Sequence, residues 1–203
     1  MSRFRIDATD IARIAVLAAV IAALGLPGAF SVFGAVPITA QTLGVMLAGT
    51  ILGAWRGFLS LLVFLALVAI GLPLLSGGHG GLAVFVGPTA GYLVGWLLGA
   101  AVVGWIVHYR GRTLTWLRTV AGLVVGGIVV IYAVGIPVQS LVTRLPLPET
   151  LLQSTVFLPG DTVKVVLAAI ITMTLVRAYP RAFRHASGAP VEAAPASEGA
   201  RVS

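Results

Sequence analysis

Long apolar runs separated by short breaks form the dominant pattern of the chain. They cover residues 11–26, 39–54, 57–75, 82–107, 120–142 and 159–179. Proline and glycine mark most breaks, and Gly87-Pro88 places the start of regular helix in the fourth run near Thr89. A bilayer-spanning helix uses about 20 mostly apolar residues, and the shorter runs fit helices that meet a water-filled cavity. The pattern therefore predicts an all-α membrane protein, a bundle of six transmembrane helices.

Composition supports a membrane protein and excludes several other classes. Of the 203 residues, 59% are hydrophobic and 9% are charged, and the mean hydropathy is +1.06. A soluble enzyme carries far more charge, and a disordered chain has low hydrophobicity. Membrane β-strands would alternate apolar and polar residues, which these unbroken runs do not. The chain has no cysteine, so disulfides, thiolate nucleophiles, iron–sulfur clusters and cysteine-based zinc sites are excluded.

The arginines predict the orientation in the cell membrane. The connections at one side of the predicted bundle carry ten arginines, whereas those at the other side carry only Arg144. Cytoplasmic loops are enriched in basic residues, so both termini are predicted to be cytoplasmic and the protein to be a multi-pass protein of the cell membrane. This bias also accounts for the net charge of +7 without nucleic acid as a partner. The ten are Arg3, Arg5, Arg13, Arg56, Arg110, Arg112, Arg118, Arg177, Arg181 and Arg184.

Two regions are expected along the chain. Residues 1–180 are predicted to form a single six-helix membrane domain, with the N-terminal run kept as the first helix and not removed as a signal peptide. Residues 181–203 are rich in Ala, Pro, Ser and Gly, which cannot bury a core. They are predicted to be a disordered cytoplasmic tail.

Asp161 and Lys164 are the main candidates for a binding site. Lys164 is the sole lysine of the chain and lies three residues after Asp161 in the last apolar run, so both side chains share one helix face. Ionisable groups inside a membrane are costly unless they are paired or face a polar cavity, which favours a ligand or ion site. The alternative is structural: Asp161 caps the helix and Lys164 extends to the outer interface.

Three further segments lie at the same, outer end of the predicted bundle. Residues 76–81 read Ser-Gly-Gly-His-Gly-Gly, so that Gly78 and His79 leave the backbone open to a ligand. Thr89 and Tyr92 open the fourth run, and Thr39, Gln41 and Thr42 open the second. Thr39 alone would more simply be a helix N-cap. With Asp161 and Lys164, these segments predict a pocket that opens outward.

Several functions are excluded by missing residues. Lys164 follows Val163 and not glycine, so the chain has no phosphate-binding loop and cannot be its own ATPase. Intramembrane proteases need a second membrane aspartate or a serine–histidine dyad in a suitable helix, and neither is evident. His79 has no cysteine or acidic neighbours, so no metal site is predicted. The chain is therefore not expected to be an enzyme, and no cofactor is expected.

Ala15, Ala19 and Ala23 recur every fourth residue on the first predicted helix. Small residues at this spacing let another helix approach closely. The neighbour could belong to the same chain or to another subunit.

Read together, four motifs resemble the BioY family, the biotin-specific substrate-capture (S) components of energy-coupling factor (ECF) transporters. They are Pro-Ile-Thr-Ala-Gln-Thr-Leu-Gly at 37–44, Gly-Leu-Pro at 71–73 before the glycine loop at 77–81, Gly-Pro-Thr-Ala-Gly-Tyr at 87–92, and Pro-Gly-Asp-Thr-Val-Lys at 159–164. Ala40 and Ala90 are conservative departures from the family pattern. The similarity runs in order from about residue 11 to 179.

The resemblance implies a six-helix substrate-binding domain that captures biotin from outside. It implies three partner proteins for uptake: a transmembrane coupling (T) subunit and two cytoplasmic ATPases. The Ala15, Ala19 and Ala23 face would then have a possible role as a subunit contact. The rival hypothesis is a self-sufficient channel or an ion- or proton-coupled carrier, with Asp161 and Lys164 as the relay.

Overall fold

The computed structural model describes residues 7–28, 36, 38–109, 114–180 and 183. This part of the chain is helical and contains no strand, and Leu75 and His79 form an isolated antiparallel bridge. The elements in order are α1 (Ala8–Ala23), α2 (Gln41–Ala69), η1 (Leu82–Phe85), α3 (Ala90–Val107), α4 (Trp116–Val124), η3 (Val125–Val130), α5 (Ile131–Thr143), α6 (Leu147–Ser154), η4 (Thr155–Phe157) and α7 (Leu158–Ala178).

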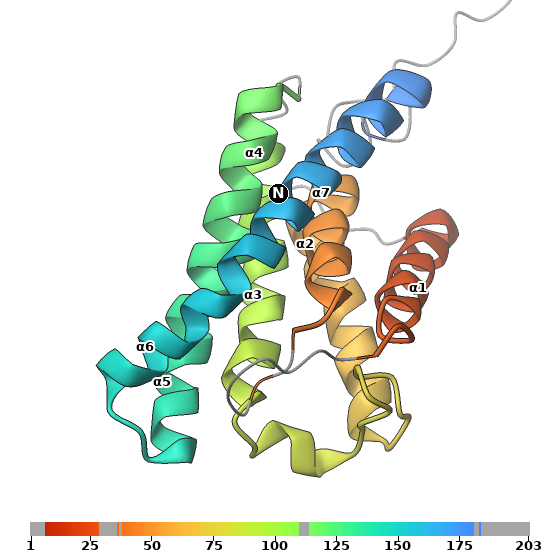
Figure 1. Ribbon diagram of the computed structural model, residues 1–203. Helices are drawn as coiled ribbons and strands as arrows, with labels where there is room; N and C mark the ends of the chain where they lie inside the picture. The colour runs from red at the N-terminus through yellow and green to blue at the C-terminus, as the bar shows by residue number, and fades with distance from the viewer. Residues whose placement is uncertain (1–6, 29–35, 37, 110–113, 181–182, 184–203) are drawn as a thin grey trace, which may run out of the picture.

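The helices form one bundle with α3 at its centre (Figure 1). On one side of α3 lie α4 and α5, and on the other lie α2 and then α1. Four helical stretches in the described part of the chain are, by length and composition, able to cross a membrane: Gln41–Ala69, Ala90–Val107, Trp116–Thr143 and Leu147–Ala178. The all-α membrane architecture is therefore confirmed.

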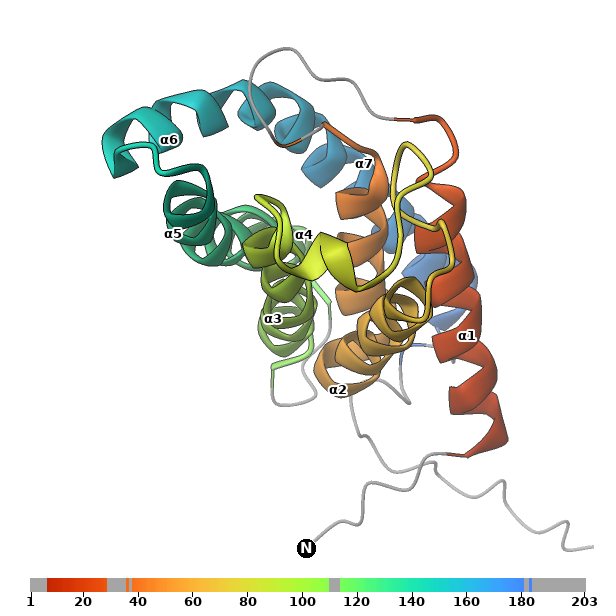
Figure 2. The ribbon, with the colours of Figure 1, turned by 90° about the horizontal axis from the view of Figure 1, so that it is seen from below.

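The helix α2 is broken by a sharp reversal at Gly53. This residue has φ 79° and ψ −179°, a conformation outside the helical region that glycine adopts without steric cost. A Cβ atom at Gly57 would lie 2.9 Å from the carbonyl oxygen of Ala48, although nine helical residues span about 13 Å along a straight axis. The two halves therefore fold back on each other, and Figure 2 shows them as separate orange and gold segments. This reversal coincides with the break predicted between residues 54 and 57.

Glycines allow the central helix to contact its neighbours through backbone atoms. A Cβ atom at Gly95 of α3 would lie 3.0 Å from the carbonyl oxygen of Ile131, at the start of α5. On the other side of α3, a Cβ atom at Gly104 would collide with the backbone of Gly53 and Ala54. Close approach of this kind is the usual means of packing membrane helices, because lipid removes the hydrophobic drive between them.

Ion pairing and a buried histidine secure the end of the bundle that carries the Gly53 turn. Asp10, in the first turn of α1, is buried and pairs with Arg56 at 2.8 Å. His108, which follows α3, donates from Nε2 to the carbonyl oxygen of Thr50 at 2.8 Å. Burial lowers the pKa of the His108 imidazole. These contacts tie the N-terminus of α1 and the end of α3 to the two halves of α2.

The last apolar run differs from its predicted extent. The sequence predicts its start at Pro159, with residues 143–160 as a connection, but helix begins at Leu147 and continues through the η4 turn into α7. Pro146 and Pro148 look like breaks in the sequence, yet proline is well suited to the first turn of a helix, where no backbone donor is needed. The predicted third run also ends earlier as helix, at Ala69. The predicted tail lies outside the described residues except for Phe183.

The packing at Gly104 yields a test of the fold. We expect Gly104→Ala to lower the free energy of unfolding by about 1–3 kcal/mol, the usual cost of overpacking, because its new methyl group meets backbone that cannot rotate away. The matched control is Gly160→Ala, whose Cβ would lie 3.9 Å from its nearest neighbour, Ile38 Cγ2. Thermal unfolding in detergent measures both. Equal melting temperatures would contradict the close contact.

Candidate ligand-binding site

A cavity of about 290 Å³ lies at the end of the bundle opposite the Gly53 turn. Its volume is near the lower end of the range of about 300–1,000 Å³ that is usual for small-molecule sites. Figure 2 views the molecule from this end. The cavity is lined by Val36, Ile38, Thr39, Gln41, Thr42, Leu75, Ser76, His79, Val84, Pro88, Thr89, Tyr92, Leu93, Trp96, Gly127, Ile131, Tyr132, Phe157, Asp161 and Lys164.

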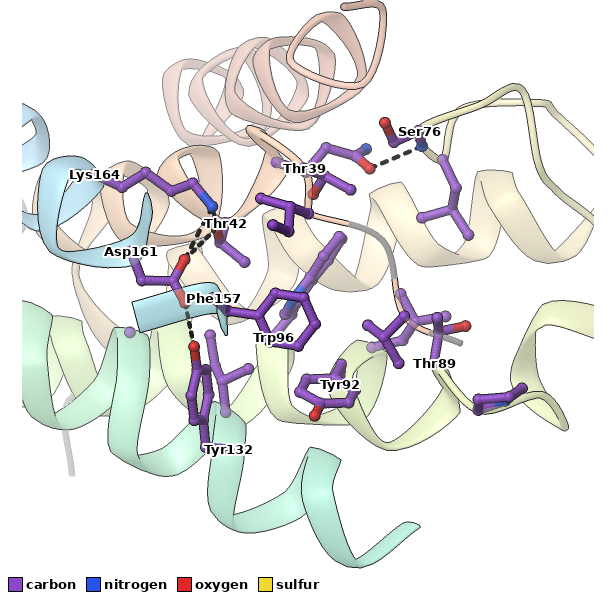
Figure 3. Close-up of a pocket in the computed structure, with 18 of the residues that line it drawn as sticks. Thr39, Thr42, Ser76, Thr89, Tyr92, Trp96, Tyr132, Phe157, Asp161 and Lys164 are labelled. Atoms are coloured by element: carbon purple, nitrogen blue, oxygen red, sulfur yellow. Dashed lines mark hydrogen bonds and ion pairs between the residues drawn. The ribbon is translucent and has the colours of Figure 1, made fainter. Parts of the chain in front are cut away.

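An ion pair forms one side of the cavity (Figure 3). Lys164 Nζ lies 2.9 Å from Asp161 Oδ1 and donates a second hydrogen bond of 2.8 Å to Thr42 Oγ1. The Thr42 hydroxyl lies 3.5 Å from the same carboxylate oxygen, and the Tyr132 hydroxyl donates to Asp161 Oδ2 at 2.6 Å. Asp161 is only 4% exposed, so these partners replace the hydrogen bonds that water would otherwise make to the carboxylate.

The position of the pair on α7 argues against the structural alternative for these residues. The N-cap of α7 is Phe157, and Asp161 contacts side chains of the next turn of α7 and of two other helices. The side chain of Lys164 is 13% exposed and turns toward Thr42 of α2. Asp161 is therefore not a helix cap, and Lys164 does not extend outward to an interface.

Aromatic rings form the apolar wall of the cavity. Tyr92 and Phe157 meet edge to face, with centroids 6.5 Å apart, and Trp96 lies beside them. The Tyr92 hydroxyl is engaged behind the wall, where it donates to Gln139 Oε1 at 2.8 Å and lies 3.2 Å from Ser154 Oγ. Tyr92 thus offers its ring to the cavity and uses its hydroxyl to hold α5 and α6 against α3.

Gln41 and Ser76 join the glycine loop to the helices. Gln41 Nε2 donates to the carbonyl oxygens of Ile21 and Leu74, and Gln41 Oε1 accepts from the Ser76 backbone N–H at 3.0 Å. Gln41 therefore fixes the rim of the cavity through its own amide. The Ser76 hydroxyl is the one buried side-chain group without a hydrogen-bond partner among the described residues.

The remaining predicted residues lie at the rim. Thr39 and Thr89 line the cavity, and neither caps a helix through its side chain: α2 is preceded by Ala40, and the Thr89 side chain makes no capping hydrogen bond. His79 also lines the cavity and donates from Nδ1 to the Ser76 carbonyl oxygen at 3.1 Å. Gly78 is in the same loop but is not a lining residue.

The structure thus brings eight of the nine predicted site residues to one cavity, all but Gly78. Their roles in binding stay predictions. Sequence reasoning missed three lining residues: Trp96, Tyr132 and Phe157. No group of three potential metal ligands occurs among the described residues.

The alanine face of α1 lies away from the cavity and from the core. Ile14, Leu17 and Ile21 are buried against the bundle, whereas Ala15 and the two alanines that follow at the same spacing are exposed. The exposed three are Ala15, Ala19 and Ala23. In the described part of the chain, no helix covers this face.

A bundle of apolar helices around a cavity with one buried ion pair defines a multi-pass membrane protein with a small-molecule site. The sequence matches the BioY family over residues 1–181, and the chain belongs to this family. The biotin transporter BioY of Rhizobium etli is 46% identical over 177 residues, which cover 84% of this chain and 95% of that protein. The biotin transporter BioY of Rhodobacter capsulatus is also 46% identical, over 182 residues, which cover 85% and 96%.

The fold has a solved counterpart. A crystal structure of the S component for biotin from an ECF-type ABC transporter superposes with a TM-score of 0.79 at 35% sequence identity. The match covers 83% of this chain and 91% of that one. Sequence and structure therefore assign the same family.

Proposed function

We propose that this chain is the substrate-capture component of an ECF transporter, and that it binds biotin in the cavity and serves its uptake across the cell membrane. The observation that carries the proposal is the buried Asp161–Lys164 pair beside an aromatic wall, in a chain whose relatives are named biotin transporters. This role is binding and transport, not catalysis.

Biotin matches the two kinds of lining chemically. Its ureido group has N–H donors and a carbonyl acceptor, which suit the Asp161 carboxylate and the Lys164 ammonium. Its thiophane ring and valeryl chain are apolar, and they suit the rings of Tyr92, Trp96 and Phe157. Its carboxylate would meet polar groups at the rim, namely Thr39, Thr89, His79 and the loop backbone around Gly78.

We further propose that the bundle crosses the membrane six times, with the cavity facing outward. The six spans would be α1, the two halves of α2, α3, the stretch from α4 to α5, and the stretch from α6 to α7. Among the described arginines, four lie at the end opposite the cavity and only Arg144 lies at the cavity end. The four are Arg13, Arg56, Arg118 and Arg177. By the positive-inside rule, their end and both termini are cytoplasmic.

Energy for uptake would come from partners. The chain has no phosphate-binding loop, since its sole lysine is Lys164 in the cavity. We propose a transmembrane coupling subunit and two cytoplasmic ATPases, with the exposed face of Ala15, Ala19 and Ala23 as the contact for the coupling subunit.

The central test is biotin binding to the purified protein. Hydrogen bonds to charged groups contribute about 1.5–3 kcal/mol, and a buried partner left without a hydrogen bond adds to the loss of binding free energy. We therefore expect Asp161→Asn and Lys164→Ala each to weaken binding by about tenfold to several hundredfold, at about 1.4 kcal/mol per decade. Biotin methyl ester should lose as much affinity as biotin in Lys164→Ala if Lys164 serves the ureido oxygen.

The matched control is Glu149→Gln, which neutralises an exposed carboxylate on α6 and should bind biotin normally. Thermal unfolding establishes that each variant is folded. Wild-type affinity in both folded cavity variants would refute the assignment of the pair to biotin.

Orientation is tested by labelling single cysteines, which the cysteine-free chain permits without background. We expect a thiol introduced by His79→Cys to react with an impermeant reagent in intact cells. One introduced by Tyr179→Cys, at the exposed end of α7, should react only after permeabilisation. The reverse pattern would invert the proposed topology.

The proposed role of the alanine face is tested by introducing bulky side chains there. Ala19→Trp and Ala23→Trp should impair co-purification with the coupling subunit and ATP-driven uptake, while biotin binding stays unchanged, because both positions lie away from the cavity. Val166→Trp is the control, on an exposed position of α7 that should face lipid. Normal assembly of both alanine variants would remove this face from the interface. Gradient-driven biotin flux by the chain alone in liposomes would instead favour the self-sufficient carrier.

A further inference from the structure

The Tyr132 hydroxyl takes up one of the hydrogen-bond positions of the Asp161 carboxylate. A carboxylate accepts hydrogen bonds at about four lone-pair positions, two on each oxygen. The Lys164 ammonium and the Thr42 hydroxyl lie on Oδ1, at 2.9 and 3.5 Å, and the Tyr132 hydroxyl lies on Oδ2 at 2.6 Å. Three of the four positions are therefore used within the protein. The one that is left belongs to Oδ2, next to Tyr132.

A π-helical segment places Tyr132 there. Val125–Val130 forms a wide turn directly before α5, and such turns insert one residue into the helical repeat. One inserted residue rotates the following side chains by about 100° relative to an uninterrupted α-helix. Ile131 consequently packs against Gly95 of α3, and Tyr132 faces Asp161 of α7.

Glycines within the π segment make the close approach possible. A Cβ atom at Gly126 would lie 2.6 Å from the Gly99 carbonyl oxygen, and one at Gly127 would lie 2.6 Å from Met46 Cε. Gly127 is itself a lining residue of the cavity. The segment that displaces Tyr132 is therefore held between α3 and α2, which fixes the position of the hydroxyl.

We propose that Tyr132 is a positioning residue that fixes the orientation of the Asp161 carboxylate, so that its open position on Oδ2 meets the N–H on one edge of a cyclic urea. This inference rests on the proposed function. On one edge of a five-membered cyclic urea, an N–H lies beside the carbonyl oxygen, and the second N–H points to the other side of the ring. The remaining position on Asp161 and the neighbouring Lys164 ammonium match the first edge, with one acceptor beside one donor. The ion pair then forms hydrogen bonds with only one of the two ureido N–H groups and with the carbonyl oxygen.

Biotin derivatives methylated at one or the other ureido nitrogen test this inference. In the wild type we expect one isomer to bind at least about tenfold more weakly than biotin, because a charged hydrogen bond is lost, and the other to stay within about threefold. If both isomers lose affinity equally, the inference that the ion pair contacts only one edge of the urea is wrong. This comparison needs no variant, and failure of biotin itself to bind would refute the proposed function instead.

Tyr132→Phe isolates the role of the hydroxyl. We expect this variant to bind biotin about five- to fiftyfold more weakly and to bring the ratio between the two methylated isomers toward one, because the carboxylate loses the partner that fixes its orientation and can turn toward either edge of the urea. Tyr179→Phe, at an exposed position on the far end, should leave both quantities unchanged. A loss of biotin affinity with an unchanged isomer ratio would show that Tyr132 supports the fold and does not set the selectivity.

Discussion

The buried carboxylate of Asp161 is the constraint around which the cavity is organised. An ionised group in the apolar interior of a membrane bundle is costly without compensation, and the protein supplies donors from three separate elements. Thr42 comes from the start of α2, Tyr132 from α5 and Lys164 from α7 itself. The same contacts therefore stabilise the charge and hold three helices at the distance that keeps the cavity open.

The two ends of the bundle differ in how their segments are joined. At the end with the Gly53 turn, glycines bring backbones into contact, as at Gly57 against Ala48. At the cavity end, glycines also bring helices together, as at Gly91 against Val134, but polar side chains such as Gln41 span the gaps between loops and helices. The cavity with the ion pair lies among these bridged segments, on the outward side in the proposed topology.

How far the sequence predicted this site depends on the kind of signal. Asp161 and Lys164 were predictable because charge within an apolar run is rare enough to demand a role. Tyr132 was not, because its direction depends on the π segment before it, which leaves no mark in an apolar sequence where every helix face looks alike. Hydropathy likewise marked the break near Gly53 but not the start of α6, where Pro148 reads as an interruption although it lies in a first helical turn.

The contacts within the ion pair also indicate which end of biotin lies next to Lys164. Lys164 already donates to Asp161 and Thr42, so any group that approaches its ammonium also approaches the Asp161 carboxylate. Two like charges about 5 Å apart repel by about 3 kcal/mol at an effective dielectric constant of about 20. A ligand carboxylate would bear this repulsion against its attraction to the ammonium, whereas a neutral ureido group bears no such repulsion and can use both charges at once. The charge distribution therefore favours the ureido ring at the ion pair and the valeryl carboxylate toward the rim, where Thr39, Thr89 and the glycine loop offer neutral partners.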